Sequence, residues 1–244
     1  MKTLSHIIAI VWLCAVAPAL GFIINPFRFA AVGGGNDPYF SSVVLLAHFD
    51  GSNGSTTIVD SSNYANTITC YNGAALTTTG SKFGSACLAT DGVDDYVSIP
   101  ASANYSFGTT TDFTVEFWLN IDSSDTSGSG VVMDTGAISL AVYASTLYAG
   151  NAGGNIFNID ISSYYNTWAF FMFRRVGSTF DLYVNGVNKG TTSGSYSYGS
   201  ASQAIKIGYA FWWGVYGKAK MDDLRITNGV GRANNVPTAA FPDS

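Results

Sequence analysis

The segment of residues 168–189, WAFFMFRRVGSTFDLYVNGVNK, constrains the fold of this chain more than any other. Residues 168–173 are all apolar, so an extended chain there has apolar side chains on both faces, as in the middle of a packed sheet. Residues 180–184 alternate, with Asp181 and Tyr183 facing away from three apolar side chains. The following Asn185-Gly186 dipeptide favours a tight hairpin turn with two positive φ angles. The segment therefore predicts neighbouring antiparallel strands.

The rest of the 244-residue chain shows the same pattern of short strands. Turn residues separate the apolar runs at intervals of roughly 8 to 12 positions, which is typical of a two-sheet sandwich. In residues 113–121 the alternate residues from Phe113 to Ile121 are apolar, so this strand has one core face. No helical periodicity is sustained outside the N-terminal segment. Further strands are expected at residues 43–49, 66–71, 86–90, 96–99, 137–143, 146–150, 204–208 and 221–227.

The composition excludes one class of partner. Only 11% of the residues are charged, the net charge is −5, and the basic residues are scattered, so we expect no nucleic-acid binding. The three cysteines, Cys14, Cys70 and Cys87, permit at most one disulfide. Cys70 and Cys87 could be neighbours across a hairpin, although two buried, reduced thiols are the favoured interpretation.

The first thirty residues differ from the rest. Met1-Lys2, a long apolar run and Ala17-Pro18-Ala19 together are typical of a secretory signal. If the segment is retained, it is either a membrane span or a hydrophobic arm buried against other subunits. Pro18 and Gly21 would kink a spanning helix, so of these two we favour the arm. The predicted domains are a hydrophobic segment at residues 1–31 (anchor arm or signal-like), a glycine-rich linker at 32–41 and a folded domain at 42–244.

Five motifs carry a resemblance to a known family. In order along the chain they are FDGSNGSTTIVDSS (49–62), SKFGSACLATDGVDDYVSIP (81–100), FTVEFWLN (113–120), W-x5-R followed by LYVNGV (168–187) and MDDLRIT (221–227). Residues 42–244 thereby resemble the laminin G-like, concanavalin A-like jelly rolls, most of all those of bacteriophage tail and virion-surface proteins. In those proteins INPFRFA, a glycine run and DPYFSSVVLL precede the first motif, and a Pro-Thr-Ala-x-Phe-Pro tail ends the domain. The resemblance implies an all-β, two-sheet antiparallel jelly-roll sandwich that binds sugars or proteins.

The chain lacks the residues for familiar hydrolytic chemistry. Glycosidases of this fold need two carboxylates beside the scissile bond, one of them usually on a Glu-x-Asp-x-x-Glu strand. The single glutamate, Glu116, is followed by FWLNI, so the paired acid of that strand is missing. We expect Glu116 to be an outward-facing strand residue. The two histidines, His6 and His48, offer no nucleophilic triad, and His48 is expected at the end of a strand. We therefore predict that the protein is not an enzyme.

A calcium site is a further expectation. In related jelly rolls a structural Ca²⁺ lies where an early aspartate loop meets the penultimate Asp-Asp strand, which the resemblance maps to Asp60 and Asp222 with Asp50 nearby. Carboxylate oxygens are the ligands that Ca²⁺ prefers. The alternative is that these aspartates bond only their own turns and caps.

One aromatic stretch, residues 209–216, suggests a ligand site. It contains Phe211, Trp212, Trp213 and Tyr216, whose flat rings could stack on sugars. Tyr148 and Asn151 would join them if the hairpin of residues 137–150 lies alongside. A subunit interface and ordinary hairpin packing are the alternative interpretations.

The sequence thus favours a non-catalytic virion-surface (tail, fibre or decoration) protein. Residues 1–31 would dock it to other virion subunits, and the jelly-roll head, expected to be a homo-oligomer, would bind glycans or a host surface. The alternatives are a purely structural decoration or oligomerisation module, and a secreted bacterial carbohydrate-binding lectin with a cleaved signal peptide.

Overall fold

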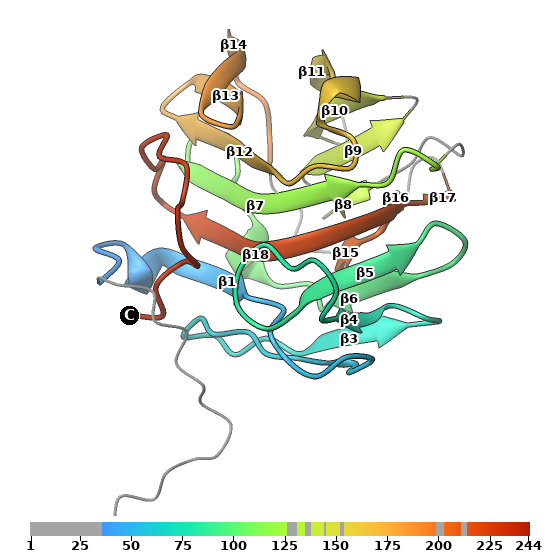
Figure 1. Cartoon of the computed structure of the whole chain (residues 1–244). Coiled ribbons are helices and arrows are strands. Elements are labelled where there is room, and N and C mark those ends of the chain that lie inside the picture. The colour runs from blue at the N-terminus through green and yellow to red at the C-terminus, as the bar shows by residue number, and fades with distance from the viewer. Residues whose placement is uncertain are drawn as a thin grey trace, which may run out of the picture. The chain divides into compact units, whose positions relative to one another are not determined.

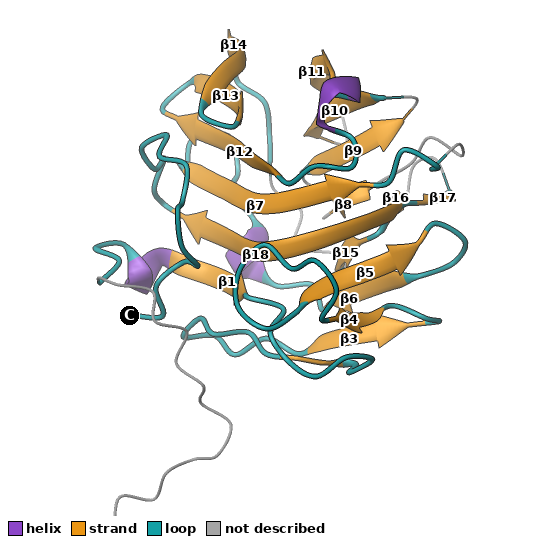
Figure 2. Ribbon diagram, viewed as in Figure 1, coloured by secondary structure: helices purple, strands orange, loops and turns teal. Residues whose placement is uncertain are grey.

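Two antiparallel sheets pack face to face in the computed structural model (Figure 1). It describes residues 36–125, 131–134 (backbone only), 138–143, 145–151, 154–198, 203–210 and 214–244. Each sheet has eight strands within these residues, and the few helices are single 3₁₀ turns (Figure 2). The all-β sandwich expected from the sequence is confirmed.

Sheet A faces the viewer in Figure 1. Its order is β14 (Val187–Ser193), β13 (Thr179–Val184), β12 (Ala169–Val176), β7 (Phe113–Ile121), β18 (Lys218–Asn228), β5 (Cys87–Asp91) and β4 (Ala75–Thr77). The eighth strand, β1 (Val43–Ala47), also pairs with β18.

Sheet B lies behind it. Its order is β11 (Gly154–Asp160), β10 (Thr146–Asn151), β9 (Ser139–Tyr143), β8 (Val131–Asp134), β15 (Ile205–Ile207), β6 (Tyr96–Ile99), β3 (Ile68–Tyr71) and β2 (Thr57–Ile58). A separate hairpin joins β16 (Tyr209–Ala210) to β17 (Val215–Tyr216). The 3₁₀ turns are η1 (Phe40–Ser42), η2 (Ala103–Tyr105) and η3 (Ser162–Tyr164).

The strands predicted from residues 168–189 hold the central position expected. β12 lies between β7 and β13, and its side chains are buried on both faces of sheet A from Ala169 to Phe173. Asn185 and Gly186 have positive φ angles of 49° and 77° and connect β13 to β14. The second predicted strand, β13, therefore ends at this turn, and the turn leads into a third strand, β14, that the sequence did not predict.

The main core lies between the sheets. Phe113, Val115, Phe117, Leu119 and Ile121 of β7 all belong to it, as their alternation predicted. Sheet B contributes the inner faces of β6, β9, β10 and β15 to the same cluster.

A second cluster, here called the tail cluster, covers part of the outer face of sheet A. It is buried because residues 229–244 return across the sheet and place Phe241 on it. Its buried members are Val43, Leu46, Trp118, Phe170, Met172, Tyr183 and Phe241.

Glu116 also lies on the outer face of sheet A, as expected. It is only 2% exposed, however, so it does not face solvent. Its Oε2 lies 2.8 Å from Nη2 of Arg225, and Nη1 of Arg225 lies 3.0 Å from Oδ2 of Asp37. Arg232 also pairs with Asp37, and the Asp37 N–H donates to the carbonyl of Ser244. Asp37, which the sequence analysis assigned to the linker, is thus a buried part of the folded domain.

Cys70 and Cys87 are free thiols, as the favoured interpretation expected, but only Cys87 is buried and Cys70 is half-buried. Burial raises the pKa of Cys87 to about 11. Residues 1–31 and Cys14 lie outside the described residues. No helix in the described part of the chain is long and apolar enough to cross a membrane.

Candidate functional site

Four tyrosines gather on the outer side of sheet B and form what we call the tyrosine cluster: Tyr71, Tyr96, Tyr209 and Tyr216. The rings of Tyr71 and Tyr96 are stacked, with centroids 4.7 Å apart and planes within 3° of each other. The centroid of Tyr96 is 6.0 Å from that of Tyr209 and 6.4 Å from that of Tyr216. Tyr71 is 43% exposed, so the cluster offers accessible ring surface.

Strand pairing explains the first half of the cluster. Tyr71 of β3 lies directly opposite Tyr96 of β6 in the ladder. The adjoining pair, Cys70 and Val97, has the opposite orientation, and Val97 is buried in the main core. Because successive side chains alternate across a sheet, both tyrosines point outward.

The β16–β17 hairpin supplies the second half. Gly208, with φ of 88°, lies between β15 and β16, where a Cβ would come within 3.0 Å of the Asp95 carbonyl oxygen. The tight turn at this glycine lets the hairpin lie beside β8 (Figure 1). Ala210 and Val215 then pack on Ala141 of β9, and Tyr209 pairs with Tyr216.

Polar groups accompany the rings. The Nζ atom of Lys206 lies 4.7 Å from the ring centroid of Tyr209 and 5.1 Å from that of Tyr96. Burial, with the neighbouring tyrosines, raises the pKa of Tyr96, so its hydroxyl stays protonated at neutral pH. The site therefore combines ring faces, hydroxyl groups and one ammonium group, each of which can contact a sugar.

The residues predicted for ligand binding are only partly brought together. Tyr216 belongs to the tyrosine cluster, and Tyr148 lies opposite Ala141 on the same outer face. The Asn151 amide instead donates to the carbonyl of Ser197 at 2.7 Å. Phe211, Trp212 and Trp213 lie outside the described residues.

Sequence reasoning missed Tyr71 and Tyr96. Both fall at outward positions of predicted strands, which is a usable signal. Their stacking depends on the β3–β6 register, and a single sequence does not give the register between strands separated by other segments.

The predicted calcium ligands differ in their suitability. Asp60 is buried, and its two oxygens accept five hydrogen bonds from Leu46, Ser62 and Asn66, so it acts as a turn residue. Oδ1 of Asp222 is buried without a hydrogen-bond partner, and the charge of Asp50 reaches it. Burial, with the charges of Asp223 and Asp50, raises the pKa of Asp222 to about 7. Asp222 therefore has an oxygen free for a cation, whereas both oxygens of Asp60 accept hydrogen bonds and Oδ1 of Asp50 accepts them from Ser85.

Within the described residues, the carboxylates that could jointly hold a metal ion are those of a different trio. Oxygens of Asp91, Asp94 and Asp95 lie within 4.8 Å of one another. Asp91 and Asp94 are exposed, and Asp95 already accepts the N–H groups of Gly73 and Asp91.

His48 lies at the end of β1, as expected, and is held between two carboxylates. Nδ1 is 2.5 Å from Oδ1 of Asp223, and Nε2 is 2.7 Å from Oδ1 of Asp243. Burial alone would lower its pKa, but these two carboxylates raise it to about 10. A permanently charged imidazolium ties the C-terminal tail to β18 and is a poor general base.

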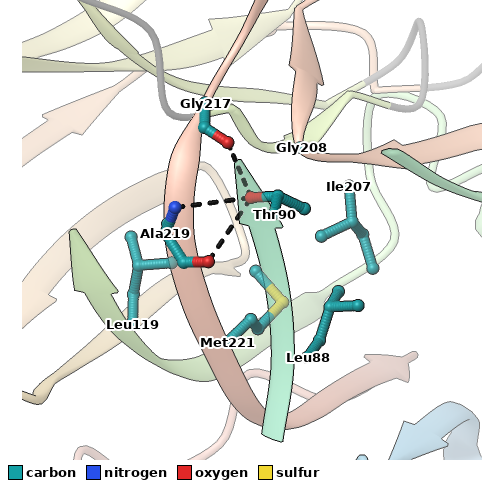
Figure 3. A pocket seen from close by; sticks show the side chains of 8 residues that line it. All are labelled: Leu88, Thr90, Leu119, Ile207, Gly208, Gly217, Ala219 and Met221. Atoms are coloured by element: carbon teal, nitrogen blue, oxygen red, sulfur yellow. Dashed lines mark hydrogen bonds between the residues drawn. The ribbon is translucent and has the colours of Figure 1, made fainter. Parts of the chain in front are cut away.

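Figure 3 shows a small pocket between the sheets near β5 and β18. Its volume is about 10 Å³, enough for a single water molecule. Thr90 donates a hydrogen bond to the carbonyl of Gly217 at 2.6 Å on its rim. The pocket is too small for a ligand.

The fold and the outward aromatic site together define a lectin-like jelly roll. Residues 91–236 match the model of the concanavalin A-like lectin/glucanases superfamily, and the chain belongs to this family. A comparison with curated protein sequences gave no match.

Solved structures show the same fold at low sequence identity. The binding domain of Paraclostridial Mosquitocidal Protein 1 is similar with a TM-score of 0.61 and 15% identity over 80% of this chain and 51% of that one. The receptor binding domain of botulinum neurotoxin D is similar with a TM-score of 0.60 and 14% identity, over 80% of this chain and 51% of that one. For the ligand binding domain of botulinum neurotoxin serotype D in complex with N-acetylneuraminic acid, the TM-score is 0.60 and the identity 14%, over 80% of this chain and 49% of that one. This chain spans about half the length of each.

Proposed function

We propose that the domain is a non-catalytic carbohydrate-binding module and that the tyrosine cluster is its glycan site. The observation that carries the proposal is the outward stack of Tyr71 on Tyr96 beside Tyr209, Tyr216 and Lys206. The apolar C–H face of a sugar packs on such rings, while hydroxyl and ammonium groups hydrogen-bond its rim. The fold, shared with receptor-binding and ligand-binding domains, is consistent with this role.

Absence of catalysis is part of the proposal. The single glutamate, Glu116, is buried and paired with Arg225, so it has no access to a substrate. Retaining and inverting glycosidases both need two accessible carboxylates on either side of the sugar bond.

A glycan array compares the full chain with Tyr216→Ala. The matched control is Tyr64→Ala, because Tyr64 is 45% exposed and lies outside the cluster. We expect Tyr216→Ala to lose at least tenfold in binding, which corresponds to about 1.4 kcal/mol, and the control to bind normally. Equal binding by both variants would argue against the site.

A second candidate is a structural decoration or oligomerisation module. Exposed aromatic clusters also mark subunit interfaces. In that case Tyr216→Ala would change the mass of the assembly in analytical ultracentrifugation and leave the array unaffected.

We further propose that the domain is displayed on a virion surface, with residues 1–31 attaching it to other subunits. The support is the motif order and the flanking INPFRFA and Pro-Thr-Ala-x-Phe-Pro segments. Weak glycan affinity would then be amplified by many copies. Mass spectrometry of the native N-terminus separates this from secretion: a start at Met1 supports attachment, and a start at Leu20 supports a cleaved leader.

A further inference from the structure

The stacked rings of Tyr71 and Tyr96 are placed for a covalent reaction with each other. The two residues lie directly opposite on β3 and β6, and the Cβ atoms of such a pair are about 4.5–5.5 Å apart. Their ring centroids are 4.7 Å apart and their planes differ by 3°. Because the separation is nearly the same at the Cβ atoms and at the rings, the side chains run side by side away from the sheet. Their hydroxyl ends are therefore neighbours.

The hydroxyl end is the reactive end of an oxidised tyrosine. After loss of one electron and one proton, much of the unpaired electron lies on the two Cε atoms, which flank the hydroxyl-bearing carbon. The parallel stack brings the Cε edge of Tyr71 against that of Tyr96. Tyr71 is 43% exposed and Tyr96 is half-buried, so both phenols can be oxidised from solution and can release their protons to water. The pair thus meets the geometric requirement for coupling of two tyrosyl radicals within one chain.

Neighbouring groups are less well placed to react with either ring. Cys70, the thiol next to Tyr71 in the sequence, faces the other side of sheet B and packs against the main core. Tyr209 and Tyr216 also lie opposite each other, with ring centroids 4.8 Å apart. Their planes are inclined by 42°, however, so their Cε edges are not aligned as in the parallel stack.

We propose that this stack is a site of oxidative modification, at which a peroxidase acting with hydrogen peroxide joins Tyr71 to Tyr96 as dityrosine. Each phenol loses one electron and one proton, and hydrogen peroxide takes up both electrons and both protons to give two molecules of water. A Cε–Cε bond forms between the two radicals. Each of these carbons then loses its hydrogen as a proton, and each phenol oxygen regains one. The product has two hydrogen atoms fewer than the starting chain.

The link would fasten one side of sheet B. β3 and β2 are the last two strands of that sheet, and β3 is joined to the rest through β6. A covalent bond between β3 and β6 therefore prevents these strands from separating at the edge. The modification is independent of glycan binding at the same cluster, because its test measures the mass of peptides and not affinity for a sugar.

The test treats the full chain with a plant peroxidase and hydrogen peroxide, at a protein concentration low enough to prevent coupling between copies. Trypsin then cleaves at Lys82, which puts Tyr71 in the peptide of residues 29–82 and Tyr96 in that of residues 83–174. We expect dityrosine fluorescence from the monomer and a linked pair of these peptides that lacks two hydrogen atoms. Fragment ions should locate the bond at Tyr71 and Tyr96. A link between Tyr209 and Tyr216 would instead stay within the peptide of residues 207–218.

Four single variants locate the reaction. Tyr71→Phe and Tyr96→Phe keep both rings and remove one phenol, so each is expected to lower the yield of the linked peptides at least tenfold. Tyr64→Phe and Tyr143→Phe are the matched controls. Tyr64 is 45% exposed and shares its tryptic peptide with Tyr71, and Tyr143 is 48% exposed and shares its peptide with Tyr96. Both controls should give the wild-type yield.

Three results would overturn the proposal. One is a wild-type yield of linked peptides in Tyr71→Phe or Tyr96→Phe. Another is dityrosine found only between Tyr209 and Tyr216 or only between separate copies of the chain. The third is no dityrosine after the peroxide has been consumed. If circular dichroism shows that a phenylalanine variant is unfolded, the position of the bond in the wild-type chain decides.

Discussion

Nη1 of Arg225 lies 3.0 Å from Oδ2 of Asp37, and this ion pair links β18 to the first described residues of the domain. Both side chains are buried, and Asp37 also receives two hydrogen bonds from Arg232. The segment around Asp37 and the C-terminal segment are thereby fixed over the outer face of sheet A. Buried pairs of this kind cost more when one partner is removed than they contribute as a pair.

Asp37→Ala is therefore expected to lower the free energy of unfolding by about 3–5 kcal/mol, because the two buried guanidinium groups of Arg225 and Arg232 are left with one carboxylate, that of Glu116, in place of two. Urea denaturation measures the change. Asp94→Ala, at an exposed aspartate, serves as the control and should stay within about 0.5 kcal/mol of the wild type. A similar small effect for Asp37→Ala would show that the pair does not fix the segment around Asp37 to β18.

The same carboxylate predicts a dependence on pH. Burial tends to raise the pKa of Asp37, but the hydrogen bonds and charges of Arg232 and Arg225 outweigh it and hold the pKa below 3.8. A depressed pKa stabilises the fold above the unfolded-state value, and this stabilisation is lost as pH falls through the folded-state value. The difference in the free energy of unfolding between the wild type and Asp37→Asn should thus become smaller as the pH falls below 3.8. A constant gap from pH 5 to pH 2 would contradict this assignment.

Arg175 is expected to hold two loops together. It is fully buried, and its guanidinium donates to the carbonyls of Phe107, Gly108 and Thr111 in one loop and, at 3.5 Å, to that of Tyr196 in the other. Arg175→Met removes the guanidinium donors of the Thr111 carbonyl, at a cost of about 1–3 kcal/mol, and leaves the carbonyls of Phe107 and Gly108 with their backbone donors alone. Hydrogen exchange should accelerate at the Tyr198 amide, which bonds the carbonyl of Gly108. Lys189→Met, on exposed β14, is the control, and equal exchange in both variants would refute the role.

Calcium binding remains a proposal for Asp222 and Asp50. Calcium at 100 times the Kd of such a site adds about 2.7 kcal/mol to the free energy of unfolding, which raises the Tm by about 5–10 °C for a domain of this size. Asp222→Asn should abolish this rise, whereas Asp60→Asn should lower the Tm equally with and without calcium. Titration of metal-stripped protein with no calcium heat and no change in Tm would remove the site.

The sequence predicted the strands well because their side-chain periodicity is local. Alternation in β7 and two-sided apolarity in β12 identified the core and the centre of sheet A. The burial of Glu116 was not predictable in the same way, since it depends on residues 229–244 crossing sheet A. Arg175 ended an apolar run in the sequence, and its burial follows from loop carbonyls that lie more than sixty residues away.

The candidate site was only partly predictable for a related reason. The aromatic stretch at residues 209–216 identified Tyr216, but its partners Tyr71 and Tyr96 come from strands that pair through long-range register. Asn151 fell in the right hairpin, yet its amide bonds Ser197. The local composition of residues 209–216 thus identified one part of the tyrosine cluster, and the pairing of distant strands determined the other residues in it.

The most direct test of the account is the affinity of the best array glycan for Tyr71→Ala relative to Tyr64→Ala, measured by isothermal titration with melting curves for both. We predict at least a tenfold loss of affinity in Tyr71→Ala and no loss in Tyr64→Ala. We also predict that the glycan recovered after the titration is chemically unchanged. Equal affinities in the two variants, or a cleaved glycan, would contradict the claim that the tyrosine cluster binds sugar without transforming it.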